Sequence, residues 1–379
     1  MCPTSKAILA LVIAGLAFSF GAVPTFAVGG DWIKYSSNPI LTSTTGGWDS
    51  DSITTPRVLY VGGVFRMWYE GVHGAATGVG YANSTDGVNW RKYPAPVLLA
   101  GATGAWDSSA ISLGSVVWNG TRFLMWYGGS SPVAFPNGAF GLATSSDGII
   151  WVKYPGNPVM TPTDIDRKYM AVPYVISLNL TYNMWYSGKS SSDPASSQVT
   201  RILYASSFDG ITWNKRPSAV LSPSTNANDW DSVSVYTPSV IFDGSIFGMW
   251  YSGLGQNLTN PQIGYATSPD GATWTKSSAN PILSAGPSGS WDSAGVEQPD
   301  AVFANGFMLF YDGLNKATGS GIGVAYAPSN FKIPEFPAIA PILLLGLLVS
   351  AATYLTSRTR PRMSQVKWAL QSAIMLGGS

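Results

Sequence analysis

The sequence has almost none of the residues that disulfide, thiol and imidazole chemistry require. Its 379 residues include one cysteine, Cys2, and one histidine, His73. Cys2 lies in an N-terminal segment that we expect to be removed on export, so the mature chain would have no disulfide and no thiol chemistry. A single histidine excludes a metal site made of several imidazoles and argues against a Ser-His-Asp triad.

Charged residues are also scarce. They make up 11% of the chain, and the formal net charge is +1. Nucleic-acid binding needs clustered Lys and Arg, so no nucleic-acid partner is predicted. Helical periodicity of useful length is missing from the repeated part of the chain. Aromatic residues, in contrast, reach 13% with 15 Trp, and we expect most of them to pack in a core.

A repeat of about 60 residues occurs five times and fixes the architecture. Each copy opens with an Asp, which stands in Trp-Asp-Ser in four copies and in Ile165-Asp166-Arg167 in the third. A Met-Trp-Tyr segment, or Leu-Phe-Tyr in the last copy, follows. The opening acids are Asp49, Asp107, Asp166, Asp231 and Asp292, and the aromatic segments end at Tyr69, Tyr127, Tyr186, Tyr251 and Tyr311.

Each copy has the pattern of four short strands. In the fourth copy, residues 239–242 and 246–251 flank Asp243-Gly244, which is typical of a tight hairpin. Residues 262–266 and 273–276 form the third and fourth strands. We therefore predict an all-β chain folded as a five-bladed β-propeller. The blades are placed at about 36–93, 94–154, 155–216, 217–277 and 278–330.

The last strand of each blade follows a Ser-x-Asp-Gly-x-x-Trp turn, which ends at Trp90, Trp151, Trp213 and Trp274. This turn resembles the Asp-box of sialidase-type propellers, one residue shorter, and we interpret its Asp as a turn cap. The fifth copy lacks the turn. Trp32-Ile33-Lys34-Tyr35 has the form of the missing strand, so we predict that residues 31–35 complete the last blade and close the ring within a propeller domain at 28–333.

The two ends carry targeting patterns. Residues 1–27 are typical of a secretory signal, and 337–355 form an apolar run long enough to span a bilayer, followed by basic residues. The positive-inside rule then places a tail at 363–379 in the cytoplasm and the propeller outside, anchored in the membrane. Pro334-Glu335-Phe336 opens an anchor at 334–362 that resembles the archaeal PEF-type sorting signal, which implies a sortase-like processing enzyme. Four Asn-x-Ser/Thr sequons fit an exported glycoprotein: Asn83, Asn119, Asn179 and Asn257.

Residues that differ between copies are the better candidates for a ligand site, since a single ligand needs asymmetry. The opening Asp residues are therefore interpreted as structural. Only the first and fifth copies carry an acid after the aromatic segment, and these copies are neighbours in a closed ring. The predicted catalytic residues are Glu297, Asp51, Glu70 and Asp312, because glycoside hydrolysis needs two flanking carboxylates. The predicted substrate-binding residues are Arg57, Trp68, His73, Tyr236 and Asp300.

Residues 31–330 resemble the five-bladed glycoside hydrolases, namely the arabinanase and β-xylosidase group (family 43) and the invertase and levansucrase group (families 32 and 68). Glu297-Gln298-Pro299 is similar to the Glu-Gly-Pro strand of that group, and the resemblance implies that Glu297 is the general acid. The group's base, an Asp directly before Pro, is absent, since those positions are Thr55, Leu113, Val172 and Thr237.

Three classes of function stay open at this point. The first is a surface-anchored glycosidase, the second a non-catalytic carbohydrate-binding or adhesion propeller, and the third a structural module of the cell envelope. A glycan is the expected partner in the first two. No cofactor or metal is predicted, although oxygen ligands in the channel would suit Ca²⁺.

Overall fold

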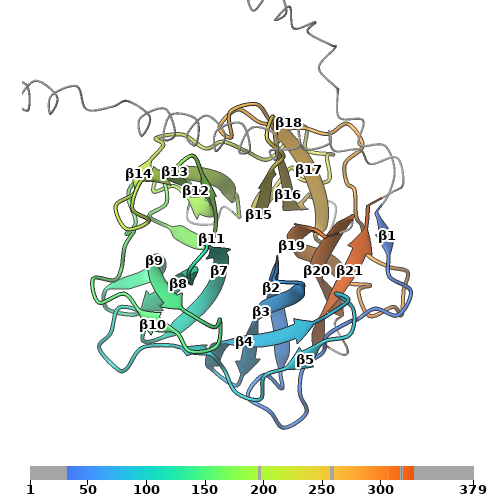
Figure 1. The fold of residues 1–379 in the computed structure, drawn as a ribbon. Coiled ribbons are helices and arrows are strands. Elements are labelled where there is room, and N and C mark those ends of the chain that lie inside the picture. The colour runs from blue at the N-terminus through green and yellow to red at the C-terminus, as the bar shows by residue number, and fades with distance from the viewer. Residues whose placement is uncertain are drawn as a thin grey trace, which may run out of the picture. The chain divides into compact units, whose positions relative to one another are not determined.

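The computed structural model describes residues 32–327, apart from 195–197, 257–259, 305, 316 and 318. Five antiparallel sheets are arranged in a ring around a central axis (Figure 1). Their inner strands are β2 (Ser52–Val61), β7 (Ala110–Trp118), β11 (Tyr169–Leu178), β15 (Ser234–Phe242) and β19 (Gly295–Phe303). The all-β, five-bladed propeller is thus confirmed.

Four blades continue outward from the inner strand in sequence order, and in the fifth the N-terminal β1 takes the outer position. The second strands are β3 (Val64–His73), β8 (Phe123–Ser131), β12 (Thr181–Lys189), β16 (Phe247–Leu254) and β20 (Phe307–Asn315). The third strands are β4 (Ala76–Ser84), β9 (Phe135–Ser145), β13 (Arg201–Ser207), β17 (Gln262–Ser268) and β21 (Gly319–Tyr326). The outer strands are β5 (Arg91–Lys92), β10 (Val152–Lys153), β14 (Asn214–Lys215), β18 (Thr275–Lys276) and β1 (Ile33–Lys34), and β6 (Leu98–Leu99) also pairs with β4.

The N-terminal strand completes the last blade, as the sequence predicts. Strand β1 pairs antiparallel with β21, with Ile33 opposite Tyr326. Lys34 forms an ion pair with Asp292, and Trp32 packs edge-on against Trp250 with ring centroids 6.1 Å apart. The ring is therefore closed by segments from both ends of the repeated region, and the edge of β21 is covered.

The repeated opening acids join the strands of their own blade. Each is at most 2% exposed. In the fourth blade, Asp231 accepts hydrogen bonds from the Tyr251 hydroxyl at 3.1 Å and the Lys276 ammonium at 2.6 Å. Four further Asp–Lys pairs repeat this arrangement, at Asp49–Lys92, Asp107–Lys153, Asp166–Lys215 and Asp292–Lys34. A buried carboxylate needs such partners, and the structural interpretation of these residues is confirmed.

The Asp-Gly turns and the Trp residues join neighbouring blades. Asp209 accepts from the amides of Ile211 and Thr212, and these bonds lower its pKa to about 2. Trp213, which ends this turn, packs on Trp126 of the preceding blade. The Trp126 indole donates to the carbonyl of Gly210 at 2.9 Å. The turn therefore fixes both its own strand and the blade junction, as expected for a cap.

The third blade differs from the others at two neighbouring positions, where one side chain is smaller and the other is larger. In the fourth blade, the Trp230 ring covers Gly264, where a Cβ atom would lie 2.6 Å from the ring. The third blade has Ile165 at the Trp position and Leu203 at the Gly position, opposite Tyr186. Both belong to the same apolar cluster. The smaller side chain at one position is thus matched by a larger one at the other.

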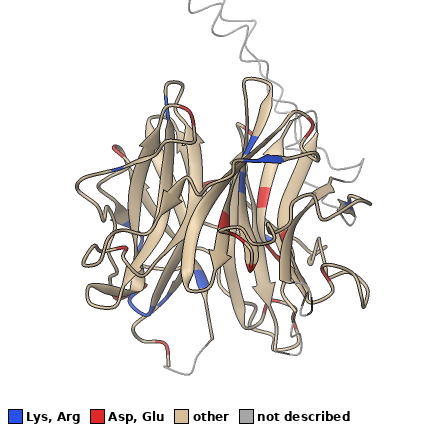
Figure 2. Cartoon of the chain, turned by 90° about the horizontal axis from the view of Figure 1, so that it is seen from below, with Lys and Arg blue, Asp and Glu red and all other residues tan. Residues whose placement is uncertain are grey.

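The predicted signal at 1–27 and apolar run at 337–355 lie outside the described residues. Within residues 32–327, as far as they are described, no helix has the length and apolar character needed to cross a membrane. Asn83, Asn119 and Asn179 are exposed, whereas Asn257 is not among the described residues. Charged positions are sparse and occur both on the blades and in the loops (Figure 2).

Candidate active site

Every inner strand is interrupted by a bulge where its sequence reaches Pro or Gly114. The register with the second strand shifts between Thr54 and Arg57 in the first blade, and at the equivalent place in the other four. The residue before Pro has a φ of 48–55° at Thr55, Val172, Thr237 and Gln298. This left-handed conformation is strained for a side chain with a Cβ atom, most of all for a β-branched one.

The bulges create a bonding position at the blade junctions. The amide of the residue at the bulge donates to the side chain that follows the aromatic segment of the preceding blade. Thr237 donates to Ser187 and Gln298 to Ser252, each at 2.9 Å. We call this side-chain position the junction position. Its five occupants are Glu70, Gly128, Ser187, Ser252 and Asp312.

Asp312 fills the junction position between the fifth and first blades. It is fully buried, and its two oxygens accept from the Thr55 amide at 3.0 and 2.9 Å. Burial raises the pKa of this carboxyl well above its usual range, and the charges of Glu297 and Glu70 raise it further. Asp312 has no exposed surface, so it acts on the site through the Thr55 backbone rather than by touching a ligand.

Glu70 fills the junction position between the first and second blades. Its Oε1 atom accepts from the Leu113 amide at 2.6 Å, and its side chain remains partly accessible. Burial raises the pKa of Glu70 to about 7, against the opposing effects of the Leu113 amide, Thr55 and Arg57. A carboxyl with this pKa can hold and release a proton near neutral pH.

Glu297 lies opposite Asp312 across β19 and β20. The Tyr236 hydroxyl donates to its Oε2 atom at 2.7 Å. Burial raises the pKa of Glu297, while the hydrogen bond from Tyr236 lowers it. Glu297 is half-buried, as are Thr54, Ser112, Ala171 and Tyr236 at the equivalent place in the other inner strands. These five residues form one layer around the central axis of the ring (Figure 1), which we call the channel mouth.

Arg57 and Asp300 lie further along the inner strands, past the bulges. Both are 2% exposed. Asp300 accepts from the Val58 amide at 2.6 Å, and Arg57 donates to the Gly114 carbonyl at 2.6 Å and stacks 5.5 Å from the Tyr174 ring. Burial raises the pKa of Asp300 to about 6, although the charge of Arg57 opposes this. These predicted substrate-binding residues hold the blades together below the mouth.

The structure brings Glu70, Glu297, Asp312 and Tyr236 together and leaves three other predicted residues elsewhere. Asp51 lies in an exposed loop and His73 at the exposed end of β3, where the Ser50 hydroxyl and Asp51 carboxylate both contact His73 Nδ1. A triad needs its Ser and Asp on different ring nitrogens, so this group is not one. Trp68 is fully buried, and its indole donates to the Gly148 carbonyl at 2.8 Å.

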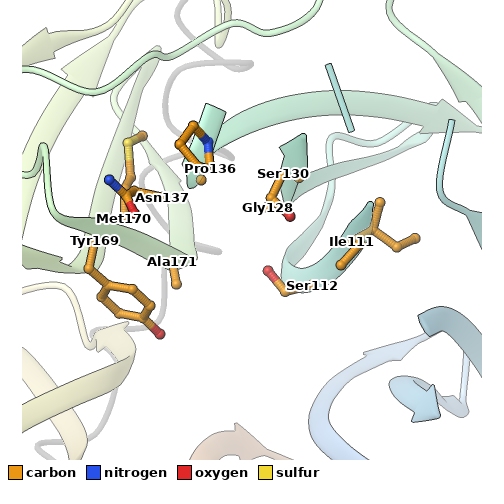
Figure 3. Close-up of a pocket in the computed structure, with 12 residues that line it drawn as sticks. Ile111, Ser112, Gly128, Ser130, Pro136, Asn137, Tyr169, Met170 and Ala171 are labelled. Carbon is orange, nitrogen blue, oxygen red and sulfur yellow. The ribbon is translucent and has the colours of Figure 1, made fainter. Parts of the chain in front are cut away.

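Tyr169 is a site residue that the sequence comparison missed. The charges of Glu70 and Glu297 both act on its hydroxyl and, after burial itself, raise its pKa. It borders a cavity of 310 Å³ between the second and third blades, lined also by Ser112, Gly128 and Ala171 (Figure 3). The repeat contains a signal for this space, because Ser112 and Ala171 are smaller than Tyr236 and Glu297 at the same position of the fourth and fifth blades.

No described part of the chain groups three or more His, Cys, Asp or Glu residues in a way that could hold a metal ion. Glu70, Glu297 and Asp312 therefore do not form a metal-ligand cluster. Glu70 and Glu297 are half-buried carboxyls whose charges both act on the buried Asp312, and half-buried carboxyls can exchange protons with a bound ligand.

No family model matches the chain. Two curated proteins of Mycobacterium tuberculosis do, the uncharacterized proteins MT1551 (strain CDC 1551) and Rv1502 (strain H37Rv). Each is 30% identical over 273 residues, which cover 69% of this chain and 88% of the relative. The chain belongs to the family of these two mycobacterial proteins.

Solved structures share the fold of this family member. A glycoside hydrolase matches with a TM-score of 0.64 at 16% identity, covering 82% of this chain and 96% of its own. A glycosyl hydrolase from Bacteroides ovatus matches with a TM-score of 0.61 at 17% identity, covering 83% and 98%. A thermostable family-43 glycoside hydrolase matches with a TM-score of 0.59 at 17% identity, covering 78% and 100%. The resemblance to five-bladed glycoside hydrolases is thus confirmed for the fold.

Proposed function

We propose that this protein acts on carbohydrate and hydrolyses glycosidic bonds at the channel mouth. The observation that carries the proposal is the convergence of Glu70, Glu297 and Asp312: Glu297 lies opposite Asp312, and the charges of Glu297 and Glu70 both act on the Asp312 carboxyl. Glycoside hydrolysis requires two carboxyl groups of different protonation on either side of the bond. The fold neighbours support the substrate class, since one is described in a complex with RGII and another targets β-1,2 mannosidic linkages.

We assign the acid role to Glu70 and the base or nucleophile role to Glu297. Glu70 has a pKa of about 7, so about half of the molecules hold its proton at neutral pH. Burial raises the pKa of Glu297 overall, but the hydrogen bond that Tyr236 donates opposes this rise and favours the charged carboxylate. This assignment reverses the one implied by the sequence resemblance, in which Glu297 is the acid. Asp312 is a positioning residue that acts through its bond with the Thr55 amide.

We further propose that the propeller is displayed outside the cell and held at the membrane. The support is the apolar run at 337–355 with its following basic residues, together with the secretory pattern at 1–27. Protease treatment of intact cells checks this. Digestion of the propeller on intact cells is expected, and protection until lysis would contradict it.

The hydrolase proposal is tested by incubating the purified full chain with a panel of plant and fungal polysaccharides and measuring the release of reducing sugar. Glu70→Gln and Glu297→Gln should each lower turnover by about 100-fold or more, since each removes one member of an acid–base pair. Asp51→Asn is the matched control, because it removes an acid that the structure places in an exposed loop, and it should retain activity. Equal turnover in all three variants would reject the assignment.

The alternative is a propeller that binds glycans without cleaving them. The absence of an Asp before Pro on the inner strands favours it, because Thr55, Val172 and Thr237 occupy those positions. Glycan-array binding by the wild-type chain, with no release of reducing sugar from the bound glycans, would select this alternative.

A further inference from the structure

The hairpins that join each inner strand to the second strand lie at the end of the ring opposite the channel mouth. The mouth residues Ser112 and Ala171 lie near the start of β7 and β11, and each strand then runs about 20 Å to its hairpin, at about 3.3 Å per residue. Two of these hairpins, in the neighbouring second and third blades, contain sequons. The sequons are Asn119-Gly120-Thr121 and Asn179-Leu180-Thr181, and both Asn residues are exposed.

Asn119 uses only one atom of its side chain to build its hairpin. Its Oδ1 atom accepts hydrogen bonds from the Thr121 amide, the Thr121 hydroxyl and the Arg122 amide at 3.0, 3.0 and 2.9 Å. Its amide nitrogen has no hydrogen-bond partner in the part of the chain that the structure describes. The Thr hydroxyl that completes the sequon therefore already contacts the amide group that a glycan would modify.

The fourth blade shows that the turn does not need this nitrogen. Asp243 occupies the place of Asn119, and its Oδ1 atom accepts from the Ser245 amide, the Ser245 hydroxyl and the Ile246 amide at 2.8, 3.0 and 2.8 Å. An aspartate thus builds the same turn. Asp243 is 5% exposed, whereas Asn119 is exposed. The nitrogen of Asn119 is not required by the fold, and it lies at the surface, where a glycan can be attached.

The hairpin of the third blade also has a counterpart without a sequon. Asn179 and Leu180 form a two-residue turn with φ of 50° and 62°. The first blade has Gly62 and Gly63 in the same place, with φ of 64° and 78°. Glycine adopts this left-handed conformation without strain, so the fold accepts Gly here as well as Asn. Leu180 is 91% exposed, so the tip of this hairpin projects into solvent.

The third described sequon has a different setting. Asn83 lies within β4, where it pairs with Arg66 on β3 and with Arg91 on β5. Ser84, the next residue, is buried, and its hydroxyl accepts from the Gly87 amide at 2.9 Å. Glycan acceptors are sequons in surface loops. Asn83, in a strand that is paired on both sides, is therefore the comparator for the two hairpin sequons.

We propose that Asn119 and Asn179 each carry an Asn-linked glycan and that Asn83 does not. The donor is a saccharide activated as a phosphate ester of a lipid carrier. The amide nitrogen bonds to C1 of the saccharide and loses one proton, while the C1–O bond breaks and the lipid phosphate leaves with its electron pair. Both glycans then lie at the end opposite the mouth, so they cover that end and leave the mouth open. The inference rests on the proposed display outside the cell but not on hydrolysis.

Mass spectrometry of peptides from the full chain tests the proposal. The chain is purified from the cells that naturally produce it and is compared with variants made in the same cells. We expect the peptides that contain Asn119 and Asn179 to carry a covalent saccharide and the peptide that contains Asn83 to be unmodified. Asn119→Asp should remove the first glycan completely, and Asn179→Gly should remove the second.

The equivalent residues of other blades make these variants well matched. Asp243 and Gly62 already occupy the two places, so both variants should retain a cooperative melting transition. Thr121→Val is a second test of the first site, because it keeps the Asn119 nitrogen and removes the Thr hydroxyl. It should abolish the glycan on Asn119, since the sequon requires Ser or Thr at this place.

Three outcomes overturn the proposal: an exported chain with either hairpin sequon bare, a glycan on Asn83, or modification of Asn119 that persists in a folded Thr121→Val variant. Protease treatment of the same intact cells separates this inference from the proposed display. Digestion of a chain with bare hairpins rejects the glycans and leaves display in place. Protection until lysis rejects display, and secretion of the full chain from yeast behind a yeast leader then decides whether the two hairpin sequons are acceptors.

Discussion

At the scale of single residues, the same position serves the fold in one blade and the site in another. Ser187 and Ser252 bond the bulge amide of the next blade with a neutral hydroxyl. Glu70 and Asp312 make the same bond with a carboxyl. A site can therefore arise in a repeat protein by exchanging a neutral acceptor for an acidic one without changing the hydrogen-bond pattern. The stability of the fold then becomes dependent on pH.

The pH dependence of stability follows from Glu70. Its pKa is raised from 4.5 to about 7 in the folded chain, so between these values the folded state holds a proton that the unfolded state has released. The free energy of unfolding should therefore fall as pH rises from about 5 to 8. Glu70→Gln should reduce this fall by about 2 kcal/mol, measured by urea unfolding at both pH values. An identical fall in wild type and variant would contradict the raised pKa.

The buried Asp–Lys pairs should contribute far more to stability than an exposed pair. Lys276→Met leaves the Asp231 carboxylate buried without its cation, and we expect a loss of about 3 kcal/mol in the free energy of unfolding. The control is Arg167→Met, which breaks the exposed pair with Asp164 and should cost less than about 0.5 kcal/mol. Chemical denaturation of both variants at pH 7 gives the comparison, and similar losses would be evidence against the role of the buried pairs.

At the scale of strands, the compensated exchange in the third blade explains how the repeat tolerates a divergent copy. In the fourth blade the Trp230 ring lies over Gly264. In the third blade the Leu203 side chain fills the equivalent space, next to the smaller Ile165. Leu203→Gly should destabilise the protein by about 3 kcal/mol, since it removes a buried side chain and leaves a cavity. Adding Ile165→Trp should recover a large part of the loss. A double-mutant cycle by thermal unfolding measures this, and strictly additive effects would show that the two positions are independent.

The N-terminal strand is short, but it buries one large side chain. Trp32 is 3% exposed and Ile33 62% exposed. Trp32→Ala should therefore cost about 3 kcal/mol or more, because it empties the contact with Trp250. Ile33→Ala is the matched control and should lie within about 0.5 kcal/mol of wild type. Thermal unfolding distinguishes them, and equal shifts in Tm would argue against a structural role for Trp32.

At the scale of the whole molecule, the period of the sequence allowed the ring, the blade closure and the joining role of the opening acids to be predicted. Five copies of Asp and Tyr at one spacing are explained most simply by one repeated contact. The convergence of Glu70, Glu297 and Asp312 followed from comparing copies that are adjacent in a ring. The cavity could not be predicted in this way, because it results from the small size of Gly128 and Ala171.

Two other features could not be predicted for physical reasons. Asp51 is as unusual among the copies as Glu70, but only the path of its loop places it in solvent beside His73. The positive φ of Thr55 opposes the preference of a β-branched residue. It exists because the bulge and the bond to Asp312 fix the backbone there, and neither is a local property of the sequence.

A circular rearrangement of the chain tests whether the ring depends on the position of β1 in the sheet or on its position in the sequence. A chain beginning at residue 36 lacks β1 and leaves β21 with an open edge, so we expect it to lose cooperative unfolding. The same chain with the turn of residues 269–273 and then Trp32-Ile33-Lys34 joined after Ala327 should regain it. In the other four blades this turn leads directly from the third strand to the fourth, which is the connection that the rearranged chain would supply. Differential scanning calorimetry of the wild-type, truncated and rearranged chains measures whether each unfolds cooperatively. Failure of the rearranged chain to fold would mean that β1 does more than complete the last blade.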